Sequence, residues 1–178
     1  MKKQVVGFVQ GLVVAAFVLS STFVVAAEMI GVLTVNAKEQ FKVSRCDKSQ
    51  GSYGLTLTLR EQGVWDYAIA DEGVNFQSYG TYAGGMTARK IDLLVSQDNQ
   101  SDLIDALEFI AGDLCNGSSV AITSYQPFVY KIKLNKRLDK AVVSLKSGMQ
   151  GYNYSYDKTG KGSFTVKAKG SYVLQAID

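Results

Sequence analysis

Residues 128–136 read FVYKIKLNK. Apolar side chains occupy every second position of this stretch until Leu134, and lysines stand between them at Lys131 and Lys133. Successive side chains of a β-strand point to opposite faces of a sheet. The alternation therefore predicts a strand with one buried face and one solvated face.

Further stretches on both sides show the same period of two. They are GLTLTLR (54–60), VWDYAIA (64–70), ARKIDLLVS (88–96) and the segments 164–168 and 172–176. Glycine-containing segments between the apolar runs favour turns, as at 60–64, 71–74, 157–162 and 169–171. The pattern predicts a chain built mainly of antiparallel strands.

One segment has a helical period instead. In SDLIDALEFIAGDLCNG (101–117) the apolar residues recur at intervals of three and four, which is typical of an amphipathic helix. Ser101 is the expected N-cap, and Asn116 and Gly117 form the expected C-terminal stop. The order of strands, one helix and more strands does not fit the βαβ alternation of a parallel sheet. We expect a mainly β (or α+β) protein, an antiparallel β-sandwich or partly open barrel covered by this helix.

The N-terminal 27 residues form a separate unit. Two lysines precede an apolar run from Val5 to Ala27, and Val25 and Ala27 suit a signal-peptidase cut before Glu28. A later cut before Lys38 is an alternative. The same run is long enough to span a bilayer uncleaved, with the N-terminus in the cytoplasm. Residues 1–27 are thus a signal peptide or a membrane anchor, and residues 28–178 form one exported domain, periplasmic or extracellular.

The first seven residues, MKKQVVG, and the apolar stretch that follows also resemble the leader of type IV pilin-like proteins. Such a leader is a short basic peptide that ends in glycine, here Gly7, before an apolar helix. Leu12 stands where bacterial pilins carry a glutamate at the fifth mature position. The resemblance covers only these residues and implies a filament subunit.

The chain contains two cysteines, Cys46 and Cys115. An even count in an exported chain favours a disulfide, and a redox pair would normally have closer spacing. Closing a loop of about 70 residues stabilises the folded state by roughly 4 kcal/mol in the chain-entropy model. We expect a structural disulfide between them.

Charge is unevenly distributed. Residues 28–127 hold seven basic and thirteen acidic residues, whereas residues 128–178 hold ten basic and three acidic ones. Packing of the two parts against each other is one interpretation. The other is a surface for an anionic polymer or lipid head groups. Its residues are Lys131, Lys133, Lys136, Arg137 and Lys140.

The chain has no histidine. Its absence removes His-dependent nucleophile activation, His general bases and His-ligated zinc sites, and two cysteines cannot complete a Cys₄ site. A small hydrolase that uses two carboxylates is the remaining enzymatic alternative. We expect no enzyme, no metal and no cofactor.

Tyrosines are the expected ligand contacts, because a phenol ring offers an apolar face and a polar edge. In GYNYSYD (151–157) three of them fall on alternate residues, which predicts one face of a strand, and two more flank a glycine loop in QSYGTYAGG (77–85). Cross-strand packing is the alternative. The tyrosines concerned are Tyr152, Tyr154, Tyr156, Tyr79 and Tyr82.

These observations predict an exported, non-enzymatic binding domain with a glycan or protein ligand. The alternative is a membrane-anchored or filament-forming subunit that keeps its N-terminal apolar helix, with membrane contact through residues 5–27. A homo-oligomer would fit this alternative. Nucleic acid is not an expected partner, because an exported chain rarely meets it and no aromatic–basic motif is present.

Overall fold

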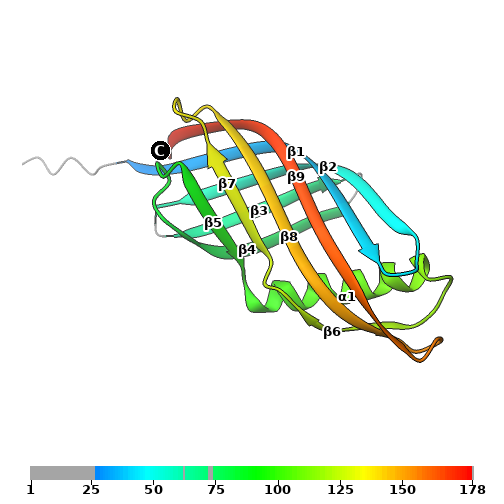
Figure 1. The fold of residues 1–178 in the computed structure, drawn as a ribbon. Coiled ribbons are helices and arrows are strands. Elements are labelled where there is room, and N and C mark those ends of the chain that lie inside the picture. The colour runs from blue at the N-terminus through cyan, green and yellow to red at the C-terminus, as the bar shows by residue number, and fades with distance from the viewer. Residues whose placement is uncertain (1–26, 62, 72–73, 178) are drawn as a thin grey trace, which may run out of the picture.

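The computed structural model describes residues 27–61, 63–71 and 74–177. The predicted N-terminal helix lies outside these residues, and so do the predictions that depend on it. Within the described residues, nine strands and one helix follow one another (Figure 1). They are β1 (Glu28–Val43), β2 (Lys48–Arg60), β3 (Val64–Asp71), β4 (Val74–Ala83), β5 (Lys90–Val95), α1 (Gln97–Leu114), β6 (Val120–Tyr125), β7 (Val129–Leu134), β8 (Lys140–Asn153) and β9 (Lys158–Ile177).

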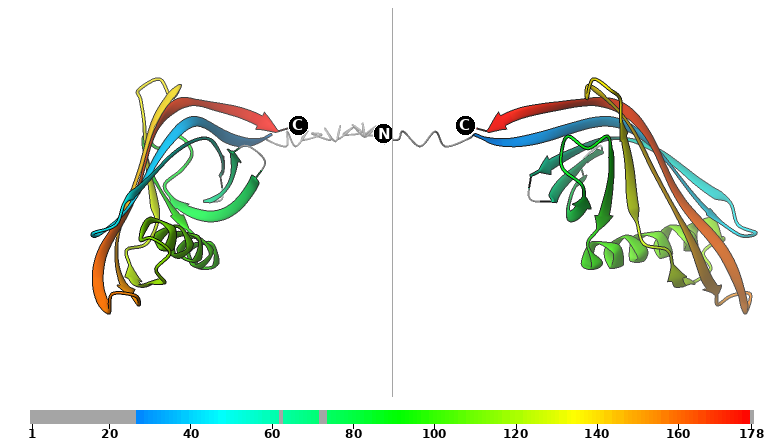
Figure 2. Two further views of the ribbon diagram at one scale, coloured as in Figure 1. Left: turned by 90° about the vertical axis from the view of Figure 1, so that its right-hand side faces the viewer. Right: turned by 60° about the vertical axis from the view of Figure 1, so that its left-hand side comes forward.

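Eight of the strands form a closed antiparallel barrel. Its order is β8-β7-β5-β4-β3-β2-β1-β9, and a β8–β9 ladder closes the circle. Figure 2 shows β3, β4 and β5 curving round opposite β8 and β9. The prediction of antiparallel strands with one helix is confirmed, but the sheet is neither a sandwich nor partly open. Within the circle, β1 pairs along its whole length with residues 162–177 of the longer strand β9.

The ninth strand, β6, lies outside the barrel circle. It pairs with residues 149–153 of β8, whereas β7 pairs with residues 141–144 of the same strand. One edge of β8 is thus shared by two short strands, while β9 occupies the other edge throughout. The ribbon of β8 and β9 continues past the point where β7 begins, and this extension carries β6 (Figure 1).

The core fills the barrel interior with the residues that the alternation marks as buried. In β2, β5 and β7 every predicted inward residue has less than 5% of its surface exposed. These residues are Leu55, Leu57, Leu59, Ile91, Leu93, Val95, Phe128, Tyr130, Ile132 and Leu134, although Phe128 itself lies just before β7. Trp65 of β3 is also fully buried. Period-two alternation therefore identified the interior correctly wherever it was applied to these strands.

Helix α1 packs its apolar stripe against the barrel as expected, with Ile104, Leu107 and Ala111 buried. It begins one turn earlier than predicted, because the Ser96 hydroxyl, not that of Ser101, accepts from the backbone N–H of residue 99 at 3.4 Å. Gln100 fixes the first turn to the barrel. Its Nε2 donates to the Val95 carbonyl at 2.8 Å, and its Oε1 accepts from the Phe128 N–H at 3.3 Å.

Two predicted turns are strand instead. Residues 158–162 and 169–171 belong to β9, which runs for 20 residues without a break. Gly170 lies so close to the Thr34 carbonyl of β1 that a Cβ atom would collide with it. The glycine there permits close contact between two barrel strands and does not mark a reversal of the chain. Within the residues described, no helix is both long enough and apolar enough to span a bilayer.

Candidate ligand pocket

A pocket of about 770 Å³ opens beside the C-terminal end of α1. Its walls are the end of β1 with the turn that follows, the last turn of α1, β6, and the extension of β8 and β9 beyond β7. The volume lies within the range of small-molecule sites, which is roughly 300–1,000 Å³. The pocket is therefore large enough for a ligand of a few linked rings.

The floor of the pocket is apolar. Phe41, Ala111 and Met149 line it, and each has 5% or less of its surface exposed. Val120 and Ile122 of β6 add half-buried aliphatic surface. These side chains belong to the same core that fills the barrel, so the floor is held rigidly by the fold.

One wall is the predicted disulfide, which the structure contains. Cys46 and Cys115 are joined with a Cα–Cα distance of 4.9 Å. Cys46 lies in the turn after β1, and Cys115 is the C-cap of α1. A backbone hydrogen bond from Asp47 N to Leu114 O, 3.2 Å long, joins the same two segments. The covalent and hydrogen-bonded links hold the turn against the helix end and keep this wall in place.

The rim is polar and carries more positive than negative charge. Three cationic side chains line the pocket, at Arg45, Lys158 and Lys161, against one carboxylate at Asp47. All four residues are exposed. Gln150 and Asn153 of β8, together with Asn116, supply amide groups for hydrogen bonds. The arrangement favours a ligand with hydrogen-bonding groups and an anionic group.

Two rim residues have left-handed backbone conformations, Arg45 with φ of 65° and Asn116 with φ of 59°. Asn116 is the expected helix stop: it donates to Asp113 O at 3.2 Å, and Gly117 donates to Gly112 O at 2.8 Å. Arg45 lies in the turn between β1 and β2, and Leu138 and Asp157 have the same conformation in two other hairpin turns, where a left-handed residue helps to reverse the chain. The turn places Arg45 at the pocket rim, next to Cys46 of the disulfide.

The predicted tyrosine strand is only partly correct. Tyr152 lies in β8, but Tyr154 and Tyr156 lie in the turn between β8 and β9, because the strand ends at Asn153. Tyr152 donates its hydroxyl hydrogen to Asp157, and its ring meets that of Tyr154 edge to face at 5.0 Å. Of the three, Tyr156 lines the pocket and is 56% exposed. Tyr154 is 63% exposed and does not line it.

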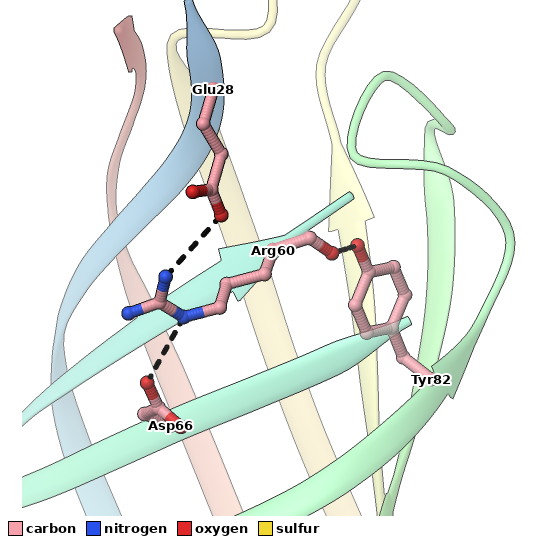
Figure 3. A network of polar contacts seen from close by, with 4 residues as sticks. All are labelled: Glu28, Arg60, Asp66 and Tyr82. Atoms are coloured by element: carbon pink, nitrogen blue, oxygen red, sulfur yellow. Dashed lines mark hydrogen bonds and ion pairs between the residues drawn. The ribbon is translucent and has the colours of Figure 1, made fainter. Parts of the chain in front are cut away.

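The other two predicted tyrosines lie on β4, away from the pocket. Tyr82 has 8% of its surface exposed and donates its hydroxyl hydrogen to the Arg60 carbonyl (Figure 3). Arg60 also contacts two carboxylates, Glu28 at 3.4 Å and Asp66 at 3.5 Å. Burial raises the pKa of Tyr82 above its ordinary value. Tyr82 is thus part of the core, and the side chain of Tyr79 lies outside the description.

The five predicted anion-binding residues are all exposed but do not line the pocket. Lys131 and Lys133 project from the outer face of β7. Lys136 and Arg137 lie in the turn that joins β7 to β8, and Lys140 begins β8. They lie together on one outer side of the barrel.

The cationic rim of the pocket was not predicted from the sequence. Its cations come from the turn after β1 (Arg45) and from β9 (Lys158 and Lys161), and the pocket as a whole is lined by three distant segments, 41–47, 111–123 and 149–162, none of which forms a motif. The pair of cysteines was the one available signal, since their bridge brings the first two segments together. Within the described chain, no group of three or more Cys, Asp or Glu side chains could hold a metal ion.

Comparison with known proteins adds nothing to this geometry: no family model, curated protein or solved structure matches the chain.

Proposed function

We propose that the protein is an exported, non-enzymatic binding domain that holds a short glycan with an anionic group in the pocket. The observation that carries the proposal is the combination of a rigid apolar floor with a polar, net positive rim. The residues of this pocket lie at the rim of a closed barrel, where ligand sites of such folds commonly form.

The chemistry of the pocket suits a sugar. A pyranose ring has an apolar face that packs on aromatic and aliphatic side chains, here Tyr156 and the floor residues. Its hydroxyl groups both donate and accept hydrogen bonds, which matches the amides of Gln150 and Asn153. A carboxylate or sulfate on the sugar would face Arg45 and Lys161.

The same lining supports binding without turnover. Hydrolysis of a glycosidic bond normally requires two carboxyl groups on opposite sides of that bond. Asp47 is the single carboxylate among the pocket residues. The chain also has no histidine that could replace the second one as a general acid or base.

Export is supported by the N-terminal sequence pattern and by the disulfide, a bond that persists in oxidising compartments. A free exported domain would begin at Glu28 and lack residues 1–27. Intact-mass measurement of the protein from its host tests this part of the proposal. A mass that includes Met1, recovered in the membrane fraction, would instead show an anchor.

A glycan array that compares acidic with neutral oligosaccharides tests the ligand. We expect binding to acidic glycans that Tyr156→Ala and Lys161→Gln each weaken about tenfold, or 1.4 kcal/mol. Tyr154→Ala and Lys146→Gln are matched controls, because both residues are exposed and neither lines the pocket. An array with no signal, or equal losses in the control variants, would rule out this ligand and this site.

A protein ligand remains the alternative occupant of the pocket. It would show as a partner captured by the wild type and lost with the Tyr156 variant. The second candidate function is a membrane-anchored or filament-forming subunit. A specific observation favours it: the outer surface carries two faces of opposite charge, described next.

A further inference from the structure

We propose that one molecule binds the next through the outer face of α1, which docks on the lysine-rich outer wall of the barrel of a second copy. The inference concerns surfaces away from the pocket and does not depend on the glycan proposal. It rests on a basic sheet face, an acidic helix face, and the match between them in charge and apolar content.

The basic face is a set of outward-pointing lysines on five neighbouring barrel strands, β5, β7, β8, β9 and β1. We call it the basic wall. It comprises Lys90, Lys131, Lys133, Lys146, Lys167, Lys169 and Lys38. All seven are exposed, and Asp92 is the acidic residue among them. In the register of β5 and β7, Asp92 lies opposite Lys131. The ion pairs of Arg60 with Glu28 and Asp66 involve none of the wall lysines.

Strand register places some of these lysines directly opposite one another. Lys90 pairs with Lys133 between β5 and β7, and Lys38 pairs with Lys167 between β1 and β9. Like charges at opposite positions destabilise a sheet by roughly 0.2–1 kcal/mol per pair. The repulsion is relieved when an anionic partner covers the wall.

The acidic face is one stripe of α1. Asp98, Asp102, Asp105, Phe109 and Asp113 fall within about 80° of the helix circumference at 100° per residue, and all are exposed. We call it the acidic stripe. The helix contains no lysine or arginine that could balance these charges. Carboxylates spaced three and four residues apart repel one another, so this face is also relieved by a partner of opposite charge.

The stripe covers 15 residue steps, or about 22 Å at 1.5 Å per residue. The five strands of the wall take up half of the eight-stranded circle, so their outer faces turn away from one another and a straight helix contacts only the central ones. Those are β7, β8 and β9, which carry Lys131, Lys133, Lys146, Lys167 and Lys169. The stripe therefore docks on these three strands.

Both faces also contain an exposed apolar residue among their charges. Phe109 is 75% exposed in the middle of the acidic stripe. Val142 is 48% exposed on β8, opposite Lys133 on one side and Lys169 on the other. An apolar contact surrounded by ion pairs is the usual anatomy of a specific interface.

The two complementary faces belong to the same chain, so a second copy of this chain supplies the partner surface. When the stripe of one copy meets the wall of the next, a free stripe remains at one end and a free wall at the other, and the assembly can grow. A two-fold dimer with two reciprocal contacts between stripe and wall would instead stop at two copies.

Sedimentation of the full-length chain, in detergent if residues 1–27 are retained, tests the proposal. We expect association at about 0.01 M ionic strength, where the Debye length is about 30 Å, and monomers at about 1 M, where it is about 3 Å. A monomer at low salt over the whole accessible concentration range would overturn the inference. Association that persists unchanged at high salt would also overturn it.

Charge reversal identifies the faces. Asp105→Lys and Lys167→Glu should each abolish self-association at low salt, and an equal mixture of the two variants should associate again. The intact wall of the first variant then meets the intact stripe of the second, and the two reversed charges also attract each other. Glu61→Lys and Lys48→Glu are controls with the same charge changes at exposed positions outside both faces.

Circular dichroism establishes that each variant is folded. A mixture that stays monomeric would contradict the contact between stripe and wall, as would association in either single variant. Salt-dependent binding of the wild type to a soluble polyanion without any self-association would assign the basic wall to a different class of partner and overturn the inference.

Discussion

At the scale of single residues, Gly170 controls how closely two barrel strands approach. A Cβ atom there would collide with the Thr34 carbonyl, which belongs to the backbone and cannot rotate away. We expect Gly170→Ala to lower the free energy of unfolding by about 1–3 kcal/mol, the usual cost of overpacking. Urea denaturation measures the change.

Gly85 provides the matched control for this substitution. It lies in the loop between β4 and β5, and nothing lies within 4 Å of its Cβ position. Gly85→Ala should therefore change stability by less than about 1 kcal/mol, since only the entropy of the unfolded chain is affected. Equal losses in the two alanine variants would show that contact with Thr34 does not set the requirement at Gly170.

Tyr172 makes stability depend on alkaline pH. Its hydroxyl donates to Met86 O at 2.8 Å, and burial, followed by the charge of Tyr82, raises its pKa from 10.0 to about 12. The unfolded chain loses this proton more easily than the folded one. The contribution of Tyr172 to the free energy of unfolding is therefore complete below pH 10, and it disappears as the pH rises to about 12. We expect a loss of at most about 3 kcal/mol across that window.

Denaturation of the wild type and of Tyr172→Phe between pH 9 and about 12 measures this contribution. The variant should start about 1–2 kcal/mol less stable, because the Met86 carbonyl loses its donor. The stability of the variant should then fall less steeply as the pH rises. The decrease that remains comes from Tyr82, whose pKa is also raised. Parallel pH curves for the two proteins would show that Tyr172 does not titrate in this range.

At the scale of elements, α1 protects the irregular edge of β6. The register between β6 and β8 shifts between Ile122 and Ser124, and the Ile122 N–H donates to Glu108 Oε1 of the helix at 2.7 Å. A carboxylate from α1 thus accepts the hydrogen bond of a backbone N–H of β6 that could otherwise pair with another strand.

Glu108→Ala should remove this acceptor and loosen β6 without disturbing the barrel. We expect faster hydrogen exchange over residues 120–125 and a loss of about 1–3 kcal/mol. Glu108→Gln is the matched variant, because its amide oxygen can still accept from Ile122. If the alanine variant exchanged no faster than the glutamine variant, the side chain would have no part in holding β6.

The elements also show what the sequence could predict. Strict alternation located β2, β5 and β7 and their buried residues, because each of these strands has one face in the core. It did not locate β1, because the residues from Glu28 onward follow directly on the apolar N-terminal run. Gly170 suggested a turn, since a glycine needed for close packing and one needed for a reversal look alike in sequence.

The sequence predicted less of the pocket than of the strands. Its apolar floor belongs to the core and carries no separate signal, and its cationic rim depends on the register between β8 and β9. Tyr156 was among the predicted ligand residues for a different reason, a strand that ends three residues earlier than expected. The acidic stripe was not predicted from the sequence, because only the exposure of its side chains separates the outer face of α1 from the inner one.

At the scale of the whole molecule, the disulfide joins parts that are 69 residues apart in sequence. Four barrel strands and the helix lie between its ends. We expect the double variant Cys46→Ser with Cys115→Ser to unfold at lower urea concentration, with a loss of roughly 4 kcal/mol from the less constrained unfolded chain.

Reduction of the wild type should have the same effect as the double substitution, and a reductant should not change the variant. Binding of an acidic glycan should weaken as well, because the bridge forms one wall of the pocket. If reduction left the urea midpoint unchanged, the bridge would contribute no stability to the native protein.

The full-length pairing of β1 with β9 fixes where the two ends of the domain lie. Glu28 is opposite Ile177, so both ends of the barrel chain leave from one pole. The pocket lies at the other end of the same two strands, among residues 41–47 and 158–162. Fifteen residue steps of β1 separate the poles, a contour of about 50 Å at 3.3 Å each. If residues 5–27 remain in a bilayer, the domain becomes a stalk that presents its pocket far from the lipid.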